Sequence, residues 1–140
     1  MDFQFFSRLF TAVSFIQVLT TIFFAILFLQ SGVDKVFDWK GNIEYHFAQF
    51  DGSPLENFFR VLFFMLTILE VACGFICLAG AAAIIFYNNK TIALAGVGLA
   101  SVIFCCLFAA QRITKEYAGA VSIVSYFILS ILAIFFLGLG

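Results

Sequence analysis

Long uncharged stretches are the feature that most limits how this chain can fold. Four stretches, each long enough to cross a bilayer, contain a single charged residue among them, Glu70. A helix needs about 20 apolar residues to cross the roughly 30 Å hydrocarbon layer. Because a backbone in lipid must satisfy its own hydrogen bonds, all four stretches are predicted to be α-helices. The predicted spans cover about residues 9–33, 61–87, 91–111 and 117–138.

The composition supports a membrane protein and excludes several other classes. Hydrophobic residues make up 64% of the chain and charged residues 11%, whereas a soluble domain is roughly half apolar and about a quarter charged. A net charge of −1 leaves no basic patch for nucleic acid. We therefore predict one transmembrane domain over residues 1–140, an all-α four-helix bundle whose partner is the lipid bilayer and not nucleic acid.

The links and the small residues indicate how the spans pack. The links after the second and third spans are only a few residues long, which forces antiparallel neighbours. The helix that carries the second span is predicted to begin at Pro54, before the span itself, with Ser53 as its N-cap and Glu56 completing a capping box. Small residues on the second and third spans predict close helix packing. They are Gly74, Gly80, Ala81, Gly96, Gly98 and Ala100.

The link between the first two spans, residues 34–53, is long and mixes charges with aromatic rings. Asn42 is predicted to cap a short amphipathic helix that lies at the membrane surface, with Trp39 and Tyr45 at the level of the headgroups. Two interpretations stay open: a lid over an opening between the spans, or an aromatic anchor. The apolar face of this helix would carry Ile43, Phe47 and Phe50.

Glu70 is the most informative polar residue, because an ionisable group inside a span is a functional-site hypothesis by default. Counted from the Asn89 turn at about 1.5 Å per residue, Glu70 and Arg112 lie at levels about 6 Å apart. We therefore predict a Glu70–Arg112 ion pair. Its alternative role is to fix helix register. The candidate polar site at this end of the bundle comprises Glu70, Arg112, Lys35, Asp34, Gln30 and Gln111.

The cysteines and the single histidine offer weaker possibilities. Cys73 and Cys105 lie at one depth, which allows a redox dithiol, although buried cysteines in apolar surroundings are usually inert and behave as small hydrophobes. His46 has no Cys or His at ligand spacing, so a surface hydrogen bond is expected rather than a metal site. The sequence contains no ligand set for haem, flavin or an iron–sulfur cluster, and no covalently bound cofactor is expected.

Two segments carry a resemblance to a known family. The end of the first span, Gly32-Val33-Asp34-Lys35, is similar to the Gly-x-x-Lys segment of DoxX-like membrane proteins. In the second span, Leu69-Glu70 followed by small residues resembles the Leu-Glu segment of that family. The resemblance implies a four-helix protein of the bacterial inner membrane, with Gly32, Lys35 and Glu70 as characteristic positions. It also implies redox work, because one DoxX-like protein is a subunit of a thiosulfate:quinone oxidoreductase.

Two functions from different classes follow. The first is a redox-associated membrane subunit that binds a quinone or an anionic small molecule at the polar end and works with other membrane or redox subunits. The second is a non-catalytic accessory subunit of a larger membrane complex. Lysine and arginine counts would place the polar end in the cytoplasm, whereas the resemblance implies that both termini are cytoplasmic. We expect the latter, because several of the bases at the polar end are predicted to pair with acids.

Overall fold

The computed structural model describes residues 3–139, and the side chains of residues 11–48 and 50–139. Every regular element in this part of the chain is helical, which confirms the all-α prediction. The helices are α1 (Phe3–Phe37), α2 (Trp39–Phe50), the short 3-10 helix η1 (Glu56–Phe58), α3 (Phe59–Tyr87), α4 (Thr91–Ile113) and α5 (Tyr117–Leu137).

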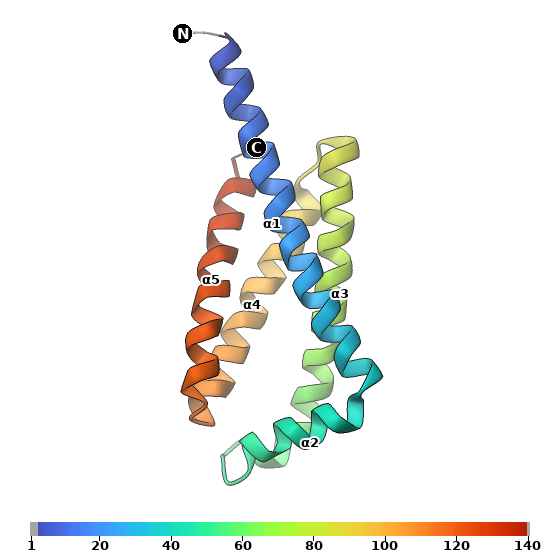
Figure 1. Cartoon of the computed structure of the whole chain (residues 1–140), viewed down its shortest axis with the longest axis vertical. Coiled ribbons are helices and arrows are strands. Elements are labelled where there is room, and N and C mark those ends of the chain that lie inside the picture. The colour runs from blue at the N-terminus through green and yellow to red at the C-terminus, as the bar shows by residue number, and fades with distance from the viewer. Residues whose placement is uncertain (1–2, 140) are drawn as a thin grey trace.

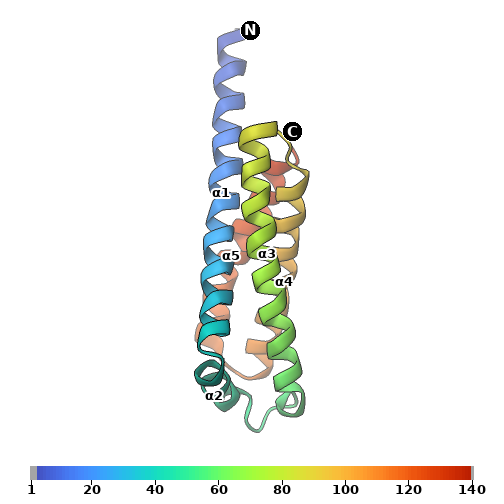
Figure 2. The same ribbon diagram turned by 90° about the vertical axis from the view of Figure 1, so that its right-hand side faces the viewer.

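Four long helices form an antiparallel bundle (Figure 1). Helix α1 packs on α3, α3 on α4 and α4 on α5, and α1 also contacts α5. The first turns of α1, the last turn of α5 and the α3–α4 link lie at one end, here called the open end. Helix α2 crosses the opposite end, here called the α2 end, beside the α4–α5 link (Figures 1 and 2).

The bundle helices are long and apolar enough to cross a membrane. The candidate spans are Thr11–Phe37, Glu56–Tyr87, Thr91–Ile113 and Tyr117–Leu137. Much of their surface carries large exposed apolar side chains. Contact of such a surface with water is unfavourable, whereas contact with acyl chains is not. The chain is therefore a multi-pass integral membrane protein.

The second span begins differently from the prediction. Ser53 Oγ accepts a hydrogen bond from the Leu55 N–H at 3.3 Å, and Glu56 Oε2 accepts one from the Gly52 N–H at 3.1 Å. These bonds close the turn after α2 rather than capping an α-helix at Pro54. A 3-10 turn follows, and the regular helix begins at Phe59.

Helix α2 is amphipathic as predicted, but Asn42 does not cap it. The helix begins at Trp39, and Asn42 Nδ2 donates from inside the helix to the Asp38 carbonyl at 2.8 Å. Aromatic rings dock α2 against the start of α3, with centroid distances of 4.9 Å for Phe50–Phe59 and 5.1 Å for Trp39–Phe63. Helix α2 is therefore fixed across the bundle end by ring packing.

Glycines decide where the helices approach most closely. A Cβ added at Gly80 would lie 2.6 Å from Ala93 Cα, and one at Gly96 would lie 2.8 Å from Cys77 Sγ, so α3 and α4 touch backbone to backbone near the open end. Gly98, by contrast, faces open space. Nearer the α2 end, the buried Phe59 and Phe63 of α3 pack against rings of α2. There α3 and α4 diverge (Figure 1).

Candidate functional site

A buried ion pair joins α1 to α3 near the α2 end. Lys35 Nζ lies 2.6 Å from Glu70 Oε2 and donates a second hydrogen bond to Ser31 Oγ at 2.8 Å. Ser31 Oγ in turn donates to the same Glu70 oxygen at 3.1 Å. Lys35 and Glu70 are only 9% and 3% exposed. The three side chains form a closed, charge-balanced triangle in an apolar setting, which is the arrangement that makes a buried charge tolerable.

Local sequence places these side chains. Ser31 and Lys35 are one helical turn apart, so they share a face of α1. Gly32 lies on the turn between them, and a Cβ there would lie 2.5 Å from Val71 Cγ2. The missing side chain lets α1 approach α3 closely, and this approach brings Lys35 within reach of Glu70. The Ser31–Lys35 spacing was the sequence signal that could have identified Ser31, which the sequence analysis did not include in the site.

The predicted Glu70–Arg112 ion pair is wrong. Arg112 is exposed in the last turn of α4, and its guanidinium carbon lies 4.7 Å from the centroid of the Tyr117 ring at the start of α5. Counting residues from the turn gives the height of a side chain along the bundle but not the direction in which its helix turns it. Asp34 and Gln30 also lie exposed, outside the triangle.

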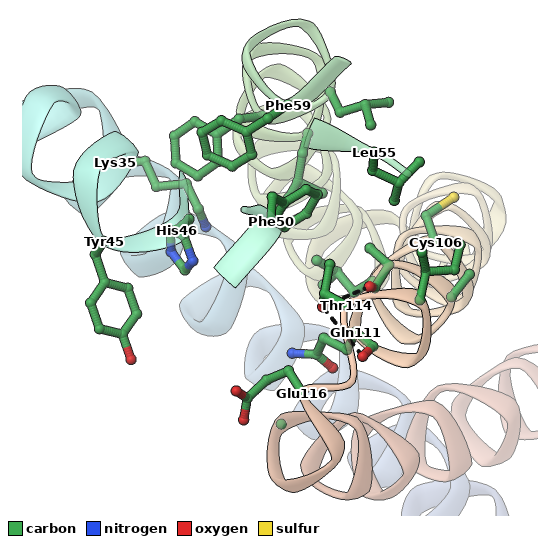
Figure 3. A pocket seen from close by; sticks show the side chains of 18 residues that line it. Lys35, Tyr45, His46, Phe50, Leu55, Phe59, Cys106, Gln111, Thr114 and Glu116 are labelled. Carbon is green, nitrogen blue, oxygen red and sulfur yellow. Dashed lines mark hydrogen bonds between the residues drawn. The ribbon is translucent and has the colours of Figure 1, made fainter. Parts of the chain in front are cut away.

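A cavity of about 610 Å³ lies beside the ion pair at the α2 end (Figure 3). It is bounded by the last turn of α1, by α2, by the segment before η1, by the first turns of α3, by the last turns of α4 and by the start of α5. Most of its lining is apolar. The lining residues are Lys35, Tyr45, His46, Phe50, Leu55, Phe59, Leu62, Phe63, Leu66, Cys106, Leu107, Ala109, Ala110, Gln111, Ile113, Thr114, Glu116 and Gly119.

The polar groups of the lining gather on one side of the cavity. Figure 3 shows Lys35, His46 and Tyr45 together, with Gln111 and Glu116 nearby, while Leu55 and Cys106 lie across from them. An ammonium has three donors, and two of those of Lys35 are used within the triangle. Gln111 lines the cavity, and its buried Oε1 has no hydrogen-bond partner among the described residues. The cavity wall therefore offers a hydrogen-bond donor on Lys35 and a hydrogen-bond acceptor on Gln111.

The charge of the lining disfavours an anionic ligand. The Lys35 ammonium is balanced by Glu70, and the half-buried Glu116 adds a negative charge. Arg112, which the sequence analysis placed in the site, is not among the lining residues. A neutral polar group suits this wall better than an oxyanion, because Lys35 is the one lysine or arginine among the described lining residues and Glu70 balances its charge.

The cysteines do not form the predicted redox pair. Cys73 is fully buried and its Sγ donates to the Gly96 carbonyl at 3.3 Å, whereas Cys105 is exposed on the outside of α4. Both are free thiols, as are Cys77 and Cys106. The equal depth of Cys73 and Cys105 along the bundle did not determine which way their side chains face, because Cys105 lies on the side of α4 that is turned away from α3. Cys106, its neighbour, lines the cavity instead.

His46 also lies differently from its expected surface position. Its ring is half-buried, 5.4 Å from the Phe63 ring and 5.1 Å from the Tyr45 ring, and it lines the cavity. Within the described part of the chain, no three His, Cys, Asp or Glu side chains gather as a metal site would require.

Comparisons of the chain with protein-family models, with curated proteins and with solved structures found no match. The resemblance to DoxX-like proteins therefore stays a prediction. The three positions on which it depends, Gly32, Lys35 and Glu70, do lie together at the α1–α3 contact.

Proposed function

We propose that this membrane protein is a redox-associated subunit that binds a quinone headgroup in the cavity at the α2 end. The observation that carries the proposal is Lys35, whose ammonium is held by a buried carboxylate and which lines a mostly apolar cavity. Sites of this kind, mostly apolar with a few convergent polar groups, are typical of small-molecule binding. A carbonyl oxygen of the quinone accepts a hydrogen bond from the remaining N–H of the Lys35 ammonium. The quinone ring packs on Phe59 and Phe63.

The reduced form of the same ligand is also accommodated. A quinol hydroxyl can donate to Gln111 Oε1, a buried acceptor without a partner among the described residues. Forming that bond removes the free-energy penalty of an unsatisfied buried carbonyl, which is about 1–3 kcal/mol. The proposal assigns the electron donor to another membrane or redox subunit, and it places the chain as a DoxX-like protein in a bacterial inner membrane with both termini cytoplasmic.

The single tryptophan offers a direct test. Trp39 lies 5.1 Å from Phe63, which lines the cavity, so a bound quinone should quench its fluorescence. We expect decylubiquinone to quench Trp39 saturably in lipid nanodiscs. The double variant Lys35→Met/Glu70→Gln removes the donor without leaving a lone buried charge, and it should weaken binding about tenfold, the equivalent of one hydrogen bond to a charged donor.

Arg112→Gln is the matched control, because Arg112 lies outside the cavity, and it should bind as the unmodified protein does. Quenching that rises linearly with the quinone content of the membrane, and equally in both variants, would contradict the proposal. The alternative function, a non-catalytic accessory subunit of a larger membrane complex, would then be favoured.

A further inference from the structure

The cavity borders the outer surface of the bundle as well as its interior. Besides Tyr45 on α2, four of its lining residues are exposed, Leu62 on α3 and Cys106, Ala109 and Ile113 on α4. Leu62 and Ile113 are 41% and 45% exposed. These four residues, here called the α3–α4 opening, are apolar or weakly polar. All four lie within candidate membrane spans, near the ends of those spans at the α2 end.

The helix packing explains why an opening forms there. Gly80 and Gly96 hold α3 and α4 in backbone contact near the open end. Toward the α2 end, Leu62 and Leu66 continue the face of α3 that Cys73 and Cys77 turn toward α4. There α3 and α4 diverge (Figure 1), and both leucines line the cavity. The opening therefore lies beyond the region in which Gly80 and Gly96 allow α3 and α4 to touch.

The lining changes in polarity from one side to the other. Lys35 on α1, His46 on α2 and Gln111 at the end of α4 supply polar groups, and Leu55 and Cys106 lie across from Lys35 and His46 (Figure 3). The exposed residues of the opening, among them Leu62 and Ala109, carry no charge. A ligand that matches this gradient has a polar head and an apolar tail. Its head carries an acceptor for Lys35 and a donor for Gln111 Oε1, and it is uncharged, because Glu70 neutralises Lys35.

We infer that the cavity takes a neutral, oxygen-bearing amphiphile from the bilayer through the α3–α4 opening, with its head beside Lys35 and Gln111 and its tail between the two helices. This inference rests on the proposed function, since it concerns the same cavity, and it adds the route of access and the class of ligand. It extends to neutral hydroxylated lipids other than quinols.

Photolabelling tests the class of ligand. A hexadecanol probe with a diazirine on its chain is photolysed with the protein in nanodiscs, and the labelled residues are mapped by mass spectrometry. We expect labels to concentrate on the α3 and α4 segments that carry Leu62 and Ala109. Excess hexadecanol should displace the probe, whereas hexadecyl sulfate, which has the same chain and a fixed negative charge, should not. Labelling spread evenly over the lipid-facing helices, or equal displacement by both competitors, would overturn the inference.

A substitution at the opening tests the route. In Ala109→Phe a phenyl ring fills the opening, and we expect labelling by the hexadecanol probe and binding of decylubiquinone to fall about tenfold or more. Ala95→Phe is the matched control, because Ala95 is an exposed alanine of the same helix outside the cavity lining. It should leave both readouts unchanged.

The failures of the two proposals are distinguishable. If hexadecanol labels the opening but decylubiquinone does not quench Trp39, the quinone proposal is wrong and the lateral route stands. If decylubiquinone binds equally well to Ala109→Phe and to the unmodified protein, the lateral route is wrong and the quinone proposal stands.

Discussion

The ammonium of Lys35 lies 2.6 Å from a carboxylate oxygen of Glu70, so the last turn of α1 and the first half of α3 are joined by a buried ion pair. The pair has two consequences. It holds the two helices in one register, and it presents a charge-balanced donor to the cavity at the α2 end. The structural and the functional interpretations of Glu70 are therefore properties of one contact, and they can be separated only by measuring stability and binding on the same variants.

Removing one member of the pair should destabilise the protein more than removing both. Lys35→Met leaves the Glu70 carboxylate buried and unpaired, with an expected loss of about 3–5 kcal/mol in the free energy of unfolding. In Lys35→Met/Glu70→Gln, the double variant used for the binding measurement, both charges are gone, and most of that loss should be recovered. Unfolding in mixed micelles with increasing SDS measures the difference. Lys40→Met, at an exposed lysine, should change little; a double variant as unstable as the single one would contradict the assigned pairing.

Two glycine-to-alanine substitutions should act in opposite directions. At Gly80 the added methyl group would meet the Ala93 backbone at 2.6 Å, and the forced separation of α3 and α4 should lower stability by about 1–3 kcal/mol. At Gly98 nothing lies within 4 Å, and the better helix propensity of alanine should leave stability unchanged or raise it by up to about 1 kcal/mol. SDS unfolding again measures both, and equal effects would argue against the close α3–α4 contact.

The four thiols should divide into two classes by reactivity. In native membranes, N-ethylmaleimide, which enters the bilayer, should alkylate Cys105 and Cys106, which are exposed on α4, faster than Cys73 and Cys77, which are buried inside the bundle. Unfolding in SDS should make all four reactive. Peptide mass mapping identifies the modified sites. A disulfide between Cys73 and Cys105 after mild oxidation would contradict the placement of Cys105 on the outside of α4.

Replacing Arg112 should have little effect on the fold. Its guanidinium packs over the Tyr117 ring at an exposed position, and such contacts contribute about 0.5–1 kcal/mol. We expect Arg112→Gln to lower the free energy of unfolding by no more than this. A loss of several kcal/mol would mean that Arg112 holds a buried acid, as the sequence analysis predicted.

Membrane orientation can be tested at the two ends of the bundle. The α3–α4 link lies at the open end and the α4–α5 link at the α2 end (Figure 1), so cysteines introduced at Asn89 and Lys115 should face opposite sides. With both termini cytoplasmic, as the resemblance implies, a membrane-impermeant maleimide added outside intact cells should label Lys115→Cys and not Asn89→Cys. Each variant is made in a background without Cys105 and Cys106, and the reverse labelling pattern would support the orientation given by the basic residues.

The sequence by itself determined the four spans, their antiparallel order and the end of the bundle at which the polar side chains gather. Length, hydropathy and short links are sufficient for this, because the bilayer imposes one helix per apolar stretch. It also indicated Gly80 and Gly96, at which α3 and α4 touch, whereas Gly74 packs against Leu29 of α1 and Gly98 faces open space. The resemblance singled out Lys35 and Glu70.

Only the tertiary structure decided which side chains meet. In the folded bundle Glu70 pairs with Lys35 rather than with Arg112, Cys105 faces outward, and a cavity lies where α3 and α4 separate. Height along a helix follows from a residue count at a constant rise, but rotation about the helix axis and lateral position in the bundle do not. Those are set by how glycines and phenylalanines pack between neighbouring helices, and this packing exists only once all four helices are together.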